Sequence, residues 1–375
     1  MSEPLKKFFS PALVGSLARD LVRAEPSFPA DAFIAQATKG LDRLELIARG
    51  KHIAAALVTH LPADYEAAVD VLIRSLGPEY ATEELVGAGM APFFYLPHTL
   101  FVAEHGLDHF DLSMRAQYEL TKRFSAEGSI RPYIARNPER VFKFLRRWAK
   151  DRNAHVRRLV SEGTRLRLPW AMRVAWLDEN PERVLELLEL LKDDPAALVR
   201  RSVANNLNDM GKVHPDLLAR TAAAWLEGAS AERRALIEHA LRSAVKRKDP
   251  DALRLLGYGA KPKIAIENVR FEPPRVAIGG NVAVSFTLRS TARAAHDLLV
   301  DLAVHFVKAN GRTSPKVFKA KRVALAPGAT VQLATRVSLA VHTTRKPNPG
   351  RHAVDVLVNG VAFPIGSFEV TAQNA

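Results

Sequence analysis

The sequence feature that most constrains the fold of this chain is an internal repeat with a period of 43 residues. Segment 137–160 recurs as segment 180–203, and twelve of the twenty-four aligned positions are identical. Each copy begins with Asn-Pro-Glu-Arg-Val, in which Asn caps a helix and Pro is favoured in its first turn. A Val-Arg-Arg run near the end of each copy opens a second helix. Repeated helix pairs bury their apolar faces against one another, so the repeat predicts a solenoid.

The helical pattern extends beyond the two copies, from the start of the chain to about residue 256. Apolar residues recur at helical spacing in 41–60 and again in 65–76, and Pro62 separates the two runs. Loops in this part are short and marked by proline, as in packed antiparallel helices. We therefore expect a mainly α domain over 1–258, built from HEAT-like repeats.

Beyond residue 258 the pattern changes from helical spacing to alternation of apolar and polar residues. The clearest alternating segments are 264–266, 282–288, 299–306, 330–339 and 352–358. Clusters of Gly, Pro and Asn-Gly separate them at regular intervals. About seven short strands in this length are typical of an immunoglobulin-like β-sandwich. We expect such an all-β domain over 263–375.

The distribution of charge divides the chain into an acidic first third and two basic stretches. Residues 1–114 hold nine basic and fifteen acidic side chains, a net charge of −6. Residues 115–260 hold 29 against 19, and residues 261–375 hold 16 against 6, so each of these stretches carries +10. A basic excess confined to part of one chain indicates a surface for a polyanion, although a proteome rich in Lys and Arg would also raise the charge.

Several classes of protein are excluded by what the sequence lacks. Cysteine is absent, which excludes disulfides, thiolate nucleophiles and cysteine-based metal sites. The first ten residues lack a signal pattern, and no apolar run is long enough to cross a membrane. No metal, Walker or dinucleotide motif occurs, and His105 with His109 is a pair better explained as surface histidines. We expect a soluble, cytoplasmic protein with no metal and no cofactor.

Candidate functional residues lie on one face of the second helix of the first copy. Arg158, Glu162 and Arg165 follow one another at helical spacing. Arginines bind phosphates, and their positive charge favours the ionised form of a carboxylate between them. Gly163 and a Pro-Trp pair make this helix irregular, which is unusual where packing alone is required. Trp170, at the end of the segment, is placed to stack or wedge against nucleic acid.

The period places Arg201, Asn205 and Asn208 at the corresponding points of the next copy, and Asp209 lies one turn after Asn205. Two adjacent repeats would then present carboxylates among arginines and amides on one surface. Arg158 and Arg201 are equally well explained as ladder residues that tie successive HEAT repeats together. The sequence leaves these two explanations open.

Four segments in this order resemble the AlkC/AlkD superfamily of HEAT-like DNA alkylation-repair glycosylases, and the AlkC branch more closely. They are 5–9, 123–132, the Ser-Glu-Gly-Thr-Arg…Leu-Pro-Trp string of 161–170, and Asn-Asn-Leu-Asn-Asp at 205–209. The resemblance covers essentially 1–258, and an immunoglobulin-like domain is appended in some AlkC-like proteins. The string of 161–170 is the most specific of these motifs.

The resemblance implies a monofunctional DNA glycosylase that hydrolyses the N-glycosidic bond of cationic N3-alkylated bases in base excision repair. The bases implied are 3-methyladenine and 3-methylcytosine, removed without turning the base fully out of the duplex. Positions that match the motifs imply catalytic roles for Glu127, Glu162 and Asp209, and DNA contacts for Arg158, Arg165 and Trp170. The implied partner is alkylated double-stranded DNA, bound by a monomer.

The basic residues of the β domain suggest a second DNA contact. Lys316 and Lys319 belong to a predicted basic hairpin, and Arg345 and Lys346 to a basic loop. We hypothesise that, together with Arg201 of the helical domain, they contact phosphates and that the β domain closes over the DNA. A solvated and merely basic surface is the alternative.

A non-catalytic HEAT-repeat scaffold that binds DNA or an acidic protein is the main alternative function. It explains the repeats, the charge and the β domain equally well, but gives no reason for carboxylates among arginines. A weaker alternative is an interaction module that pairs with a protein through the edge strands of the sandwich.

Overall fold

The structure is a computed structural model that describes residues 5–80, 89–256, 258, 262–341 and 347–372, apart from the side chains of 319 and 320. The chain divides into two compact units, residues 1–242 and 243–375. The first unit is helical. The second contains the β-strands together with the last short helix. The mainly α solenoid followed by an all-β sandwich, predicted from the sequence, is confirmed.

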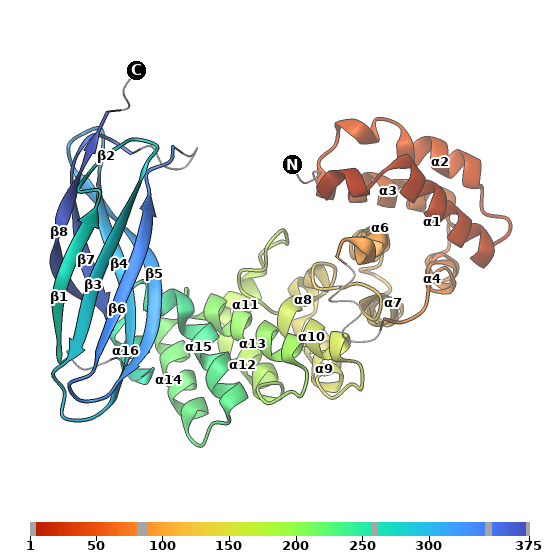
Figure 1. Cartoon of the computed structure of the whole chain (residues 1–375). Coiled ribbons are helices and arrows are strands. Elements are labelled where there is room, and N and C mark those ends of the chain that lie inside the picture. The colour runs from red at the N-terminus through yellow and green to blue at the C-terminus, as the bar shows by residue number, and fades with distance from the viewer. Residues whose placement is uncertain (1–4, 81–88, 257, 259–261, 342–346, 373–375) are drawn as a thin grey trace. The chain divides into compact units, whose positions relative to one another are not determined.

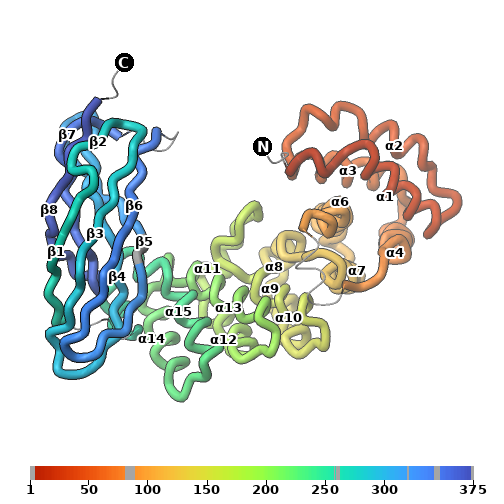
Figure 2. The backbone as a smooth tube through the Cα atoms, viewed as in Figure 1, coloured from red at the N-terminus to blue at the C-terminus, as the bar shows by residue number. Residues whose placement is uncertain are grey.

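Successive helices of the first unit pack side by side, as Figures 1 and 2 show. The α-helices are α1 (Pro11–Ala24), α2 (Ala30–Thr38), α3 (Leu46–His60), α4 (Tyr65–Arg74), α6 (Leu96–His105), α7 (Phe110–Thr121), α8 (Arg131–Arg136), α9 (Pro138–Trp148), α10 (Ala154–Gly163), α11 (Ala175–Glu179), α12 (Pro181–Glu189), α13 (Ala197–Met210), α14 (Pro215–Leu226) and α15 (Ala231–Lys246). Short 3-10 turns cover η1 (Leu5–Phe8), η2 (Leu41–Arg43) and η3 (Ala91–Tyr95).

The internal repeat appears as two pairs of consecutive helices, α9 followed by α10 and α12 followed by α13. Their first helices both start at the proline of Asn-Pro-Glu-Arg-Val, where the missing N–H of proline costs no helical hydrogen bond. Asn153 caps α10, because its side chain accepts from the backbone of His155 at 2.8 Å. Helix α10 packs directly on α13, so the second helices of the two copies are neighbours.

A buried ion pair ties the two copies together. Arg157 donates to both carboxylate oxygens of Asp194, at 2.6 and 2.9 Å, and the Asp194 side chain is only 3% exposed. The same carboxylate accepts from the backbone N–H of Ala196, just before α13 begins. One side chain therefore joins the repeats and orders the start of the next helix.

The sequence suggests Arg158 and Arg201 as the residues that tie successive repeats together. In the structure this position belongs to the preceding arginine of each copy, Arg157 or Arg200. Arg157 and Arg200 make matching contacts with the backbone carbonyls that precede their own helices. Arg158 and Arg201 follow them on α10 and α13 and point to another face of each helix. These two side chains are thus available for a different role.

Two facing sheets form the sandwich of the second unit (Figure 1). Its strands are β1 (Ile264–Glu272), β2 (Arg275–Ala277), β3 (Asn281–Ser290), β4 (His296–Val307), β5 (Thr313–Leu325), β6 (Thr330–Ser338), β7 (Gly350–Val358) and β8 (Val361–Thr371). They are ordered β1-β3-β6 and β2-β8-β7-β4-β5, and only β2 with β8 is parallel. Alternate residues such as Val284, Phe286 and Leu302 face inward and fill one apolar core.

The last helix, α16 (Pro250–Leu255), belongs to the same compact unit as the sandwich. Leu253 lies so close to Gly360 that a Cβ at this glycine would be 2.7 Å from the leucine methyl. Tyr258 is buried, with the Arg322 guanidinium 5.8 Å from the centre of its ring. Packing therefore divides the chain within α15, earlier than the 258–263 junction at which the sequence pattern changes.

Among the described helices, none has the length and apolar character that crossing a bilayer requires.

We predict that Asp194→Ala lowers the free energy of unfolding of the helical unit by about 3 kcal/mol, because it leaves Arg157 buried without its counter-charge. The neighbouring Asp193 pairs with Arg233 at the surface, and its side chain is 48% exposed. Asp193→Ala should cost less than about 1 kcal/mol. Urea unfolding followed by circular dichroism measures both, and equal effects would contradict the ladder.

Candidate functional site

Five predicted site residues form one continuous chain of ion pairs across three segments of the helical unit. Arg158 donates to Glu127 at 2.9 Å and lies 3.8 Å from Glu162. Arg165 donates to Glu162 at 2.6 Å and to Asp209 at 2.8 Å. The order is therefore Glu127–Arg158–Glu162–Arg165–Asp209, and we call these residues the carboxylate network.

Three further side chains complete the coordination of the carboxylates. Ser125 donates to Glu127 at 2.7 Å, and Ser202 donates to Glu162 at 2.5 Å. Lys212 donates to Asp209 at 2.8 Å. With this lysine included, three carboxylates face three cations, and the network is electrically balanced.

The three carboxylates differ greatly in their exposure to solvent. Asp209 and Glu162 are 1% and 5% exposed, respectively. The Glu127 side chain is 30% exposed. Glu127 is therefore the member of the network that a molecule from solvent reaches first, and the other two lie beneath the surface.

The two arginines of the network remain charged, although burial disfavours the charged form of a guanidinium group. Burial by itself would lower the pKa of Arg165, but Glu162 and Asp209 outweigh that effect and raise this pKa above its ordinary value. Burial likewise opposes the charge of Arg158, and Glu127 with Glu162 raises its pKa. Each arginine thus holds two carboxylates in place at the same time.

A buried arginine fixes the loop that follows α10. Arg131 is 1% exposed and donates to the backbone carbonyls of Gly163, Arg165 and Met172, at 2.9, 2.8 and 2.6 Å. Burial lowers the pKa of Arg131 to about 10, so it stays protonated near neutral pH. A Cβ at Gly163 would lie 2.8 Å from Ile130, so the close approach of these segments requires glycine.

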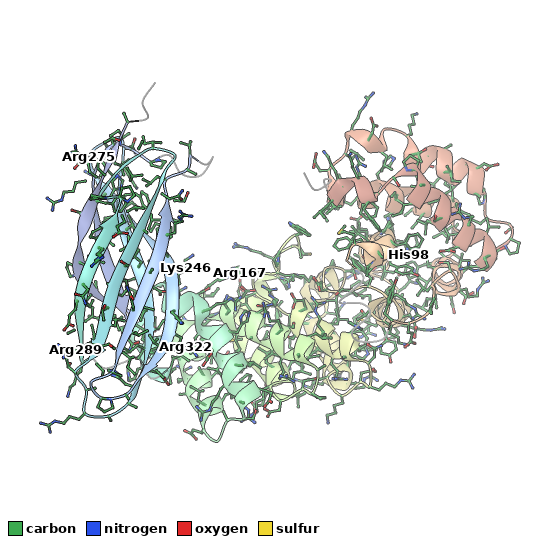
Figure 3. All side chains as sticks on the ribbon, in the orientation of Figure 1. His98, Arg167, Lys246, Arg275, Arg289 and Arg322 are labelled. Carbon is green, nitrogen blue, oxygen red and sulfur yellow. The ribbon has the colours of Figure 1, made fainter. Side chains whose placement is uncertain are left out.

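The loop presents Trp170 to solvent. This side chain is 72% exposed, and its backbone has φ = 58°, a left-handed conformation that costs a non-glycine residue of order 1 kcal/mol. Arg167, labelled in Figure 3, donates to Asp178 at 2.8 Å and fastens the same loop to α11. An exposed, strained tryptophan on an anchored loop is a feature expected of a binding site.

Trp170, Glu127 and Arg158 line one open pocket of about 600 Å³ in the helical unit. Phe93, Phe124 and Leu168 contribute apolar walls, and Lys51 with Glu104 forms a separate ion pair of 3.1 Å in the lining. Glu162 and Asp209 do not line this pocket. The network thus opens onto it through Glu127 and Arg158.

The remaining predicted residues lie elsewhere. Arg201 is exposed on α13, outside the carboxylate network, and Lys316 is exposed on β5 in the other unit. The side chain of Lys319 and residues Arg345 and Lys346 lie outside the described part of the chain. The turn at 310–311 joins β4 to β5, so Lys316 and Lys319 follow it on one strand.

Sequence reasoning missed Ser202, Lys212 and Arg131. Lys212 follows Asp209 by three residues, a spacing that could have revealed the pair. Arg131 bonds only backbone carbonyls in distant segments, and no pattern of residue types announces such contacts. In the described part of the chain, no three His, Asp or Glu side chains are grouped as a metal site requires.

We predict that Arg165→Met lowers the free energy of unfolding by about 3 kcal/mol, because Glu162 and Asp209 would both be left without this cation in a buried setting. Arg146→Met is the matched control, since its pair with Glu186 is largely exposed and should contribute less than about 1 kcal/mol. Urea unfolding measures the difference. Similar values for both variants would show that the network does not stabilise the fold.

Comparisons with known proteins agree with this fold. Residues 124–247 match a family described as DNA alkylation repair enzyme, and residues 265–372 match the C-terminal Ig-like domain of YhaZ. The chain is 31% identical to the uncharacterized protein YhaZ of Bacillus subtilis (strain 168), over 98% of this chain and 99% of that protein.

A solved structure is similar over the whole chain. It is Pseudomonas fluorescens alkylpurine DNA glycosylase AlkC bound to DNA that contains an abasic site analog. The identity is 34% and the TM-score 0.88, covering 99% of this chain and all of that chain. The chain therefore belongs to the AlkC-like branch of the DNA alkylation repair enzymes and carries a YhaZ-type C-terminal Ig-like domain.

Proposed function

We propose that this chain is a monofunctional DNA glycosylase that hydrolyses the N-glycosidic bond of cationic N3-alkylated bases, 3-methyladenine and 3-methylcytosine. The observation that carries the proposal is the balanced carboxylate network, which opens through Glu127 onto the pocket lined by Trp170. The similarity to an alkylpurine DNA glycosylase bound to abasic-site DNA supports it, because an abasic site is what base removal leaves.

The chemistry of such a reaction matches what the network offers. An alkylated base that carries a positive charge is already a good leaving group, so little general-acid help is needed. The enzyme must stabilise an oxocarbenium-like sugar and position a water, and fixed carboxylates do both. Their places are set before substrate arrives, because each carboxylate is held by an arginine and by a second donor.

The exposure of the three carboxylates suggests different roles. We assign direct contact with the water or the sugar to Glu127, since it is the exposed member and lines the pocket. Glu162 and Asp209 would contribute negative charge from beneath and hold Arg158, which lines the pocket, and Arg165, whose side chain is 11% exposed. These two arginines would contact the DNA backbone at the edge of the network.

Trp170 would hold the distorted DNA while the base stays within the duplex. Its exposure, its strained backbone and the anchoring of its loop by Arg131 support this role. A rigid aromatic side chain can stack against a base or wedge between bases without a pocket that encloses the base. A strained conformation kept in place by a buried arginine is better explained by binding than by packing.

We propose alkylated double-stranded DNA as the partner of both units. In the β unit, Lys316 and Lys321 are exposed on β5, an edge strand of its sheet. Together with Lys319, Arg345 and Lys346 they would contact phosphates. We further propose that the protein acts as a monomer in the cytoplasm. Light scattering of the protein with and without duplex DNA tests whether it is monomeric.

We predict that Glu127→Gln lowers the single-turnover rate of base release from methylated duplex DNA by about 100-fold, the usual effect of removing one preorganised electrostatic group. Glu162→Gln and Asp209→Asn should also lower it. Glu104→Gln is the control, because this glutamate lines the same pocket but pairs with Lys51 outside the network. Released bases are quantified by mass spectrometry.

Two outcomes would contradict this assignment. If Glu127→Gln and Glu104→Gln release bases equally fast, Glu127 has no catalytic role. If the wild-type protein binds methylated DNA and releases no base, the scaffold alternative replaces the glycosylase.

For the β unit, we predict that the double substitution Lys316→Gln with Lys321→Gln weakens binding to duplex DNA. The dependence of log Kd on log salt should become shallower by about 2, because each of the two lysines would neutralise one phosphate. Arg270→Gln with Arg275→Gln removes the same charge from β1 and β2, away from β5. Fluorescence anisotropy at several salt concentrations measures both. Identical slopes for the two double variants would rule out a specific contact by β5.

A further inference from the structure

The second copy of the repeat replaces a network carboxylate by an amide. Arg201 and Asn205 on α13 occupy the positions of Arg158 and Glu162 on α10, 43 residues earlier. In the first copy, Arg158 is neutralised by Glu127 and Glu162. In the second copy no carboxylate stands at the equivalent helical position, so the repeat keeps the cation without its counter-charge.

Helix α15 adds two groups to this place. His239 lies 3.0 Å from the side-chain oxygen of Asn205, and Arg242 donates to the same oxygen at 3.0 Å. An arginine only donates, so the amide atom that faces it is the oxygen, and His239 must donate as well. The orientation of the Asn205 amide is thereby fixed, with its oxygen occupied and its N–H group directed away from both donors.

Positive charge accumulates here without a paired carboxylate in the described part of the chain. Among the residues that the structure describes, the ion pairs of the nearby Asp209 go to Arg165 and Lys212, and Arg201 and Arg242 form none within 4 Å. The nearby carboxylate network is already balanced, with Asp209 shared by Arg165 and Lys212. Arg201 and Arg242 thus add two charges that the described part of the fold does not neutralise.

The nearby positive charges also act on the pKa values of Arg242 and His239 on α15. Burial lowers the pKa of Arg242, and the charges of Arg165 and Arg201 lower it further although Asp209 opposes them. Burial and the positive charges of Arg242 and Arg201 lower the pKa of His239 to about 4, so this histidine is neutral near pH 7. An anion bound here would relieve the repulsion between the arginines.

We propose that Arg201, Asn205, His239 and Arg242 form a subsite for one phosphodiester of the DNA backbone. Two guanidinium groups supply charge, and the fixed amide supplies N–H donors to a phosphate oxygen. Asn205 lies one helical turn before Asp209, so the subsite adjoins the carboxylate network on α13. This proposal depends on the proposed function in one respect only, which is that the ligand is DNA.

In this arrangement the two copies of the repeat have different functions. The first copy carries balanced carboxylates beside a pocket, and the second carries unbalanced cations beside the first. A phosphate gripped next to the network would fix the register of the strand relative to Glu162 and Asp209. The two copies differ in function because Asn205 stands in the second copy where Glu162 stands in the first.

Binding of a short unmodified duplex to the full-length protein, measured by fluorescence anisotropy across a range of salt concentrations, tests the subsite. Asn205→Asp keeps an acceptor for His239 and Arg242 but restores the missing counter-charge, as in the first copy. Arg242→Gln removes one cation. Each variant should make the dependence of log Kd on log salt shallower by about 1 and weaken binding about tenfold at low salt.

Arg220→Gln on α14 is the matched control, since it removes one exposed positive charge outside this cluster and should leave the slope unchanged. Thermal unfolding of every variant identifies any that misfold. If Arg242→Gln misfolds, Asn205→Asp still tests the proposal. The proposal is overturned if both cluster variants bind like the Arg220 variant.

The same samples separate this proposal from the glycosylase itself. If wild type releases no base but the slopes change as expected, the phosphate subsite stands and the proposed activity fails. If wild type releases bases and the slopes do not change, the activity stands and the subsite is wrong.

Discussion

Arg165 is the residue on whose ion pairs the rest of the site depends. It follows the last turn of α10 and joins Glu162 of its own repeat to Asp209 of the next, both nearly inaccessible to solvent. Two buried carboxylates one repeat apart would repel each other and require solvation that the interior does not provide. With Arg165 between them they become a fixed electrostatic feature, and the packing of α10 on α13 sets its geometry.

The repeat architecture explains how one fold accommodates acidic and basic functions side by side. Arg157 and Asp194 connect the copies, which leaves Arg158 and Arg201 free to diverge in their partners. In one copy the arginine pairs with Glu162 and with Glu127, which lines a pocket, and in the next it belongs to a cluster of cations around Asn205. Under the proposed function, equivalent positions 43 residues apart would serve a positively charged sugar in one copy and a phosphate in the next.

Much of this could be predicted from sequence, because repeats and helical spacing survive in the order of residues. The starts of α9 and α12, and the shared face of Arg158 and Glu162 on α10, followed from those patterns alone. Arg165 was expected on the same helix face, but α10 ends at Gly163 and Arg165 reaches Glu162 from the turn that follows it. The family motifs supplied Glu127, which no local spacing links to α10. Contacts made through the backbone could not be predicted: Arg131 fixes the Trp170 loop by bonding carbonyls in segments far along the chain.

The most direct test of the proposed activity is the identity of what wild-type protein releases from methylated duplex DNA, determined by mass spectrometry, together with the integrity of the strand. We predict free 3-methyladenine or 3-methylcytosine and an uncut strand that contains an abasic site. The strand should stay uncut because Lys212 is paired with Asp209 outside the pocket, and Lys51, which lines the pocket, is paired with Glu104 outside the network. Tight binding to the same DNA with no released base would contradict the proposal and leave a protein that binds DNA without chemistry.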